Sequence, residues 1–145
     1  MNLTQRLYLG LAIVLALAVT ITPIGFRALE VFTFHMIQHI TLLMVVGSLL
    51  VLATTQTLRT KLNSNKIFRA LTSPWISFAL YAVMMIGVHL PVVHLFIMHN
   101  SWAHYFVEVP LYLTVPYLFY FNILESNLVE RRLSTAMSVI LLWLM

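Results

Sequence analysis

The chain has 145 residues, of which 61% are hydrophobic and only 8% are charged, and it carries a formal net charge of +4. Apolar runs long enough to cross the ~30 Å hydrocarbon core of a bilayer recur along it, which excludes an ordinary water-soluble domain and predicts a polytopic membrane protein. Cysteine is absent, which excludes disulfides, thiolate metal sites and thiol redox chemistry.

The apolar runs are continuous and lack the alternation of barrel strands, so they predict helical spans. The expected fold class is therefore all-α, a polytopic transmembrane helix bundle with four full spans and a short fifth, in a single domain over residues 1–145. No A-x-A-type cleavage signal follows the first run, so it is interpreted as a span and not as a secretory leader. In chain order, the expected spans cover residues 7–24, 29–53, 74–96, 102–124 and 133–145.

Prolines and run length modify the later spans. Pro91 is expected to bend the far end of the third span, and Pro110 and Pro116 are expected to kink the fourth by removing backbone donors. The fifth run has 13 residues and reaches only ~20 Å at ~1.5 Å per residue. We therefore expect either that a partner completes this helix or that the chain is a shortened relative of a longer protein.

Lysine and arginine are distributed unevenly between the two ends of the expected spans. The polar loop 54–73 has four basic residues and no acid, and the N-terminus and the charged loop 125–132 carry further arginines, whereas Arg27 alone lies on the opposite side. By the positive-inside rule, the N-terminus and both segments are cytoplasmic. This distribution explains the net charge, so lipid is expected as a partner and nucleic acid is not. The cytoplasmic basic residues are Arg6, Arg59, Lys61, Lys66, Arg69, Arg131 and Arg132.

The second apolar run contains an unusually polar stretch, Phe34-His-Met-Ile-Gln-His39. On an α-helix His35 and His39 are four residues apart, so both imidazoles lie on one face with Gln38 beside them. Ionisable residues inside a span are costly and rare, so a shared metal ion, a haem edge or a proton is the favoured interpretation. Hydrogen bonds that hold helices together are the alternative.

All six histidines fall toward the extracytoplasmic side of this topology. His94 is five residues from His89, about 140° round a helix, so the two can face one site only if Pro91 reorients the end of the span. His99 lies near the interface and is interpreted as an ordinary polar residue. The candidate metal ligands are His35, His39, His89 and His104, and the candidates for additional ligands or outer partners are Glu108, His94, Gln38 and Met36.

The donor atoms limit the chemistry of such a site. Neutral imidazole binds copper, zinc and iron, and methionine thioether adds a preference for Cu(I). A histidine-rich, cysteine-free site that faces an oxidising compartment therefore favours copper, with zinc as an alternative. Histidines that face each other from separate helices can also ligate a b-type haem. The sequence has no nucleophile with a base, no phosphate-binding glycine loop and no paired carboxylates, so the chain is not expected to be an enzyme.

The same residues resemble a known family. The pattern Phe34-His35-Met36-x-Gln38-His39 is followed by Leu-Leu-Met at 42–44, and then by His89-x-Pro91, a short turn and an acidic helix start. Over residues 29–124 this resembles the CtaG-type cytochrome c oxidase assembly proteins, in a shortened and divergent form. The resemblance implies a multi-pass protein of the bacterial inner membrane that supplies or inserts copper during maturation of haem–copper oxidases. It picks out His35, His39, His89 and Glu108.

Three functions fit these observations. The first is a membrane protein that handles copper or assists assembly for a haem–copper oxidase or a related membrane copper enzyme. The second is a non-catalytic subunit that stabilises a respiratory oxidase or a membrane monooxygenase, and the third is an electron-transfer subunit that binds haem b. All three imply other integral membrane subunits as partners.

The charge distribution predicts the topology directly. A reporter fused after Lys66 should behave as cytoplasmic, and a reporter in the turn from His99 to Ser101 should behave as extracytoplasmic, because the basic segments stay on the inner side. Alkaline phosphatase and fluorescent-protein fusions measure the two outcomes. The reverse pattern would move every histidine to the cytoplasmic side and contradict the site inferred from them.

Overall fold

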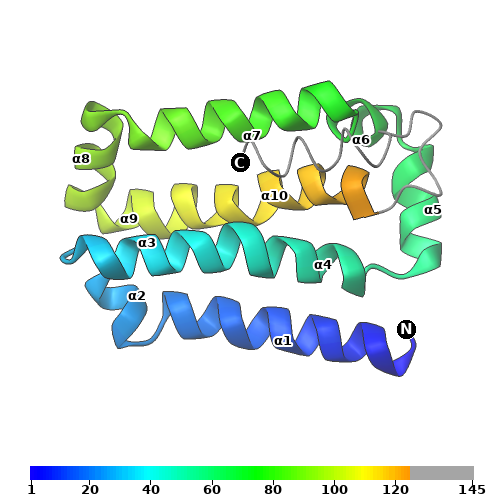
Figure 1. Cartoon of the computed structure of the whole chain (residues 1–145), viewed down its shortest axis with the longest axis horizontal. Helices are drawn as coiled ribbons and strands as arrows, with labels where there is room; N and C mark the ends of the chain where they lie inside the picture. Colours follow the sequence, from blue (N-terminus) through cyan, green and yellow to red (C-terminus); the bar gives the residue numbers. More distant parts are fainter. Residues whose placement is uncertain (125–145) are drawn as a thin grey trace.

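All regular structure in residues 1–124, the part of the chain that the computed structural model describes, is helical. The expected all-α fold is confirmed there. The long helices lie side by side, with α4 packed between α1 and α10, and α10 packed between α4 and α7 (Figure 1). The α-helical segments that make up these long helices are Leu3–Thr20 (α1), Phe32–Ile40 (α3), Gly47–Ala53 (α4), Pro74–His89 (α7), Ser101–Ala103 (α9) and Val109–Leu124 (α10). Two π-helical segments, η1 (Thr41–Val46) and η2 (His104–Glu108), connect α3 to α4 and α9 to α10.

The number of spans differs from the prediction. Among the described residues, three continuous stretches are long and apolar enough to cross a membrane, namely Leu3–Thr20, Phe32–Ala53 and Ser101–Leu124. A fourth candidate consists of α7 and α8 (Pro91–His99), which are bent by 71° and form a span only if they are taken together. Three continuous spans and one broken one therefore replace the expected four full spans, and the expected fifth span at 133–145 lies outside the described residues.

The break between α7 and α8 has its cause in Pro91. A proline ring disfavours the helical conformation of the residue before it, and Leu90 accordingly has extended backbone angles, φ −61° and ψ 130°. Pro91 itself occupies the first turn of α8, where its missing N–H would have no intrahelical partner anyway. The expected bend within one span is thus the end of one helix and the start of another. We call this junction the α7–α8 elbow; beyond it, α8 runs across the end of the bundle (Figure 1).

Segment 54–73, expected to be a polar loop, contains two short helices, α5 (Gln56–Ser64) and α6 (Lys66–Leu71). The side chains of Thr55 and Asn65 accept hydrogen bonds from backbone N–H groups in the first turn of each helix. Such caps satisfy donors that a helix start otherwise leaves free. These cap residues explain why a polar segment is helical here.

The second and fourth spans approach each other closely at Gly47. A Cβ atom placed on Gly47 would lie 2.7 Å from the Cβ of Pro116, closer than two carbon atoms pack. The backbone angles of Gly47 are helical, φ −56° and ψ −46°, so glycine is needed here for space and not for conformation. Small residues let membrane helices approach closely. The apolar core around this contact includes Leu42, Val46 and Phe119.

Gly47→Ala should destabilise the fold. The added methyl group must displace the ring of Pro116 or the backbone of α4, and overpacking of this kind costs ~1–3 kcal/mol. Gly10→Ala is the matched control, because nothing lies within 4 Å of a Cβ atom at Gly10. There alanine should stabilise the helix by ~0.5–1 kcal/mol relative to glycine. Thermal unfolding of both variants in one detergent measures the difference, and equal unfolding temperatures would contradict the close contact.

Candidate metal centre

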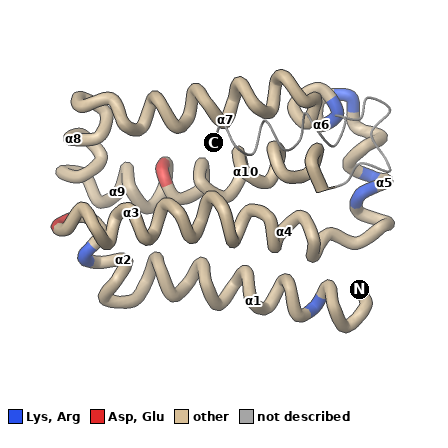
Figure 2. Tube along the Cα trace, viewed as in Figure 1, with Lys and Arg blue, Asp and Glu red and all other residues tan. Residues whose placement is uncertain are grey.

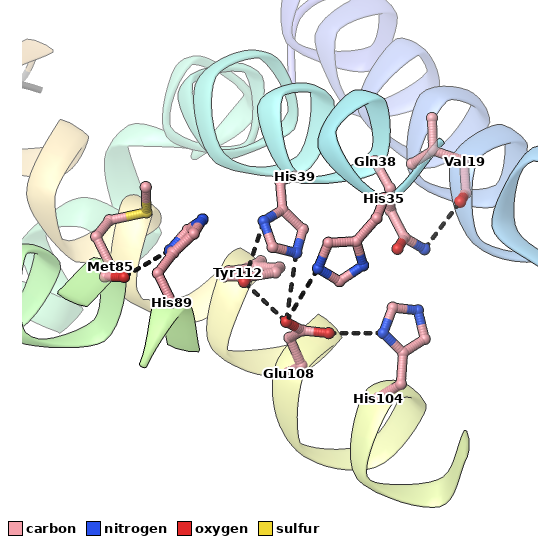
Figure 3. Close-up of polar contacts among 9 residues, drawn as sticks. All are labelled: Val19, His35, Gln38, His39, Met85, His89, His104, Glu108 and Tyr112. Carbon is pink, nitrogen blue, oxygen red and sulfur yellow. Dashed lines mark hydrogen bonds and ion pairs between the residues drawn. The ribbon is translucent and has the colours of Figure 1, made fainter. Parts of the chain in front are cut away.

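Two histidines of α3 and the last residue of η2 meet in the interior of the bundle (Figure 3). His35, His39 and Glu108 are 1%, 2% and 0% exposed, respectively. The Nε2 atom of His39 lies 3.3 Å from Oε1 of Glu108, and the Nε2 atom of His35 lies 3.9 Å from the same oxygen. One ligand atom from each residue lies within 4.8 Å of the other two. Small side-chain movements would therefore suffice to hold a metal ion between them.

The two histidines converge because of their spacing on α3. They are four residues apart, and their ring centroids lie 3.9 Å from each other, as the sequence predicts. The helix becomes π-helical at Thr41, two residues after His39, and the facing span is π-helical up to Glu108. A π turn contains one residue more than an α turn, so it changes the direction of the side chains before it, and such turns are frequent at functional sites.

The π turn that ends at Glu108 has a local cause. Pro110 has no N–H, and in a regular α-helix its ring would clash with the carbonyl of Phe106. In the wider π turn, the N–H of Val109 bonds to the carbonyl of His104, which relieves the crowding. A proline that the sequence marked only as a kink therefore sets the direction in which the polar residues before it point.

Glu108 is held by two side chains of its own span. The Nδ1 atom of His104, four residues earlier, lies 2.6 Å from Oε2, and the hydroxyl of Tyr112, four residues later, donates to Oε1 over 2.9 Å. Because a carboxylate accepts hydrogen bonds, His104 donates through Nδ1–H. Both partners are buried, so the carboxylate is removed from water and oriented by charge-assisted hydrogen bonds.

The hydroxyl of Tyr112 also determines which nitrogen of His39 carries a proton. Its single hydrogen goes to Glu108, so the 3.3 Å contact between this hydroxyl and Nδ1 of His39 requires a proton on Nδ1. In the neutral tautomer, Nε2 of His39 then directs a lone pair at a carboxylate oxygen 3.3 Å away. Two electron-rich atoms at this distance repel each other unless a cation lies between them. That cation is either a proton, carried by His39 or by Glu108, or a metal ion.

Several imidazole nitrogens of the cluster have no hydrogen-bond partner. They are both ring nitrogens of His35, Nε2 of His39 and Nε2 of His104, and all are buried. Leaving a buried polar atom unpaired costs ~1–3 kcal/mol. Imidazole lone pairs together with one carboxylate are a donor set that suits copper and zinc. The residues present therefore fit a metal ion of this class.

The match of this chain to a family of known proteins covers nearly its whole length. The family is described as the cytochrome c oxidase caa3 assembly factor (Caa3_CtaG), and the match runs over residues 3–145. The chain belongs to this family. No curated protein and no solved structure matches it. The resemblance seen over residues 29–124 is confirmed and extends beyond the motifs that first indicated it.

Tyr112 is a residue of the candidate site that the sequence analysis missed. Its contacts with His39 and Glu108 join α3 to α10. The available signal was the spacing of His104, Glu108 and Tyr112 at intervals of four, which places all three on one helix face. Tyrosine is also common at the edges of membrane helices, so this spacing was not decisive without the facing helix.

Gln38 contacts α1 through its amide group. Its Nε2 donates to the carbonyl of Val19 over 2.9 Å. That carbonyl lacks its usual donor because the residue four positions later is Pro23, which begins α2 (Pro23–Arg27). The Oε1 atom of Gln38 has no hydrogen-bond partner. Met36 is half-buried on the same helix, and its position one residue after His35 directs it about 100° away.

The histidines of α7 and α8 lie on either side of the elbow. The ring centroid of half-buried His94 is 5.1 Å from that of His35, and the ring centroid of exposed His89 is 5.8 Å from that of His39. The 71° bend at Pro91 reorients the chain between them and brings both rings beside one cluster. His99 is exposed, and its Nδ1 bonds to a carbonyl of its own helix.

Tyr112→Phe should destabilise the fold. The change leaves Nδ1 of His39 without its acceptor and Oε1 of Glu108 without one donor, and buried groups that lose a partner cost ~1–3 kcal/mol. Tyr81→Phe is the control, because Tyr81 is also buried but its hydroxyl makes no hydrogen bond within the described residues. Thermal or denaturant unfolding in detergent measures the two variants. If both unfold like the wild type, Tyr112 does not support the cluster.

Proposed function

We propose that this assembly factor handles copper during maturation of a haem–copper oxidase and that it binds the metal between His35, His39 and Glu108. The observation that carries the proposal is the buried cluster of unpaired imidazole nitrogens around one carboxylate. Membership of a cytochrome c oxidase assembly family supports the oxidase as the recipient. The role proposed for the chain is binding and delivery of an ion, without catalysis.

The available ligand atoms and the membership of an oxidase assembly family together favour copper over zinc. Imidazole binds both metals, and the absence of thiolate removes the ligand on which many structural zinc sites depend. His104 donates to Glu108 through Nδ1 and leaves Nε2 free, so it fits the role of a partner that orients the carboxylate or of a further ligand. An incomplete set of protein ligands suits a cargo that is later released.

The distribution of charge supports the proposed orientation in the bacterial inner membrane. In Figure 2 the basic residues of α5 and α6 gather at the same end of the bundle as the N-terminus. α2, which ends at Arg27, lies at the opposite end together with α8, and η2, which ends at Glu108, contacts α8. A cytoplasmic N-terminus then directs the cluster toward the outer side of the membrane. The partners proposed are integral membrane subunits of the oxidase or of a related membrane copper enzyme.

A non-catalytic stabilising subunit is the second candidate. The chain of contacts from His104 through Glu108 and Tyr112 to His39 would in that case serve to hold α3 against α10. The remaining alternative, a haem b subunit, finds less support. His35 and His39 leave the same face of one helix, and a carboxylate lies between them and the facing helix, where a macrocycle would have to fit.

His35→Ala and His39→Ala should each abolish stable copper binding. Each removes a ligand that neighbours cannot replace, so affinity should fall by at least ~10–100-fold, and oxidase activity in the host membrane should fall with it. If the pair only joins helices, its hydrogen bonds are worth ~0.6 kcal/mol each and metal content should not change.

His99→Ala is the control for this experiment, because His99 is exposed and bonds only within α8 among the described residues. Elemental analysis of the purified variants after copper loading and desalting gives the copper content per chain. Equal copper in all three variants and the wild type would overturn the proposed site.

A further inference from the structure

A metal ion that reaches a buried site inside a helix bundle must not be left without ligands on the way. Moving a bare ion through a medium of low dielectric constant is prohibitively costly, because water no longer solvates the charge. The ion therefore has to pass directly from one ligand to the next. Such transfer needs donor atoms arranged in steps between the surface and the cluster.

His89 has the properties of an outer step. It is exposed at the end of α7, and its Nδ1 lies 2.7 Å from the carbonyl of Met85 (Figure 3). Because a carbonyl only accepts, Nδ1 carries the proton and Nε2 presents a free lone pair. Histidines that bind metals commonly have this arrangement, with one nitrogen fixed by a backbone carbonyl and the other open. The ring of His89 lies 5.8 Å from that of His39, measured between centroids.

His94 has the properties of an inner step on the other side of the elbow. It is half-buried, intermediate between exposed His89 and buried His35. Its ring centroid lies 5.1 Å from that of His35, in an edge-to-face arrangement. The two pairs of rings thus connect the surface of the elbow to both histidines of the cluster.

We propose that the α7–α8 elbow is the passage by which the metal ion enters and leaves the buried cluster, with His89 and His94 as the transfer ligands. They hold the ion during exchange and are not needed to retain it at rest. The inference rests on the proposed function, because it requires that the cluster of His35, His39 and Glu108 binds the ion. In addition, the rate of metal exchange depends on His89 and His94, whereas the affinity depends on His35 and His39.

Exchange kinetics of the purified full-length chain test the passage. Each variant is loaded with one equivalent of Cu(I) without oxygen and mixed with excess bathocuproine disulfonate, whose coloured complex reports the rate of copper loss. Titration with the same chelator gives the affinity. His99→Ala is the matched control, because His99 is exposed and its Nδ1 also lies 2.7 Å from the carbonyl four residues earlier, as for His89. Within the described residues, however, it makes no ring contact with the cluster.

His89→Ala and His94→Ala should keep one copper ion per chain with nearly wild-type affinity, while copper loss slows by roughly tenfold or more, which is ~1.4 kcal/mol of added barrier per tenfold. His99→Ala should lose copper at the wild-type rate. His89→Gln and His94→Gln repeat the test with less change in polarity, in case an alanine variant does not fold.

Unchanged rates in the His89 and His94 variants would overturn the passage. A loss of affinity as large as that of His39→Ala would overturn it too, since the two residues would then be ligands of the resting site. A wild-type chain that binds no copper would overturn the proposed function and the passage together. If the wild type binds copper and His39→Ala does not, the proposed function stands whatever the exchange rates show.

Discussion

The buried carboxylate of Glu108 is the constraint on which the rest of the structure depends. With 0% exposure it is closed to bulk solvent, and an uncompensated charge in such a place costs several kcal/mol. Its own span supplies two donors, from His104 and Tyr112, and the facing helix supplies the imidazoles of His35 and His39. The cation proposed to bind among these groups would offset the cost of burying this charge. His35 and His39 of α3 therefore face Glu108 of η2 and Tyr112 of α10, with all four side chains buried.

Two prolines shape the backbone around this carboxylate in different ways. Pro91 ends one helix and begins another, so the chain turns by 71° and brings histidines from both sides of the turn to the cluster. Pro110 leaves its span unbroken but is accommodated by a π turn that ends at Glu108. The difference follows from the neighbouring residues. Leu90 adopts an extended conformation, whereas Val109 stays helical, with φ −58° and ψ −46°.

Sequence reasoning succeeded where the signal is local. The spacing of His35 and His39 predicted their common face, and the apolar runs predicted the helical class. It failed where the outcome depends on contacts between distant segments. Tyr112 joins the site only because α3 lies opposite it, at a sequence separation of 73 residues. The helices in segment 54–73 were missed because polar composition was weighed above the capping residues Thr55 and Asn65. The break at Pro91 was expected as a bend, since composition alone does not show how far a chain turns.

The hydrogen bond from Gln38 to Val19 gives α1 a role in a site to which it contributes no side chain among the described contacts. In hydrocarbon the carbonyl of Val19 has no water to replace this donor, and Pro23 cannot supply one. Rotation of α3 about its own axis would therefore break a bond that nothing nearby restores. One residue step corresponds to ~100° of rotation, enough to turn His35 and His39 away from Glu108. The first helix thus fixes the rotational register of the helix that carries the two imidazoles.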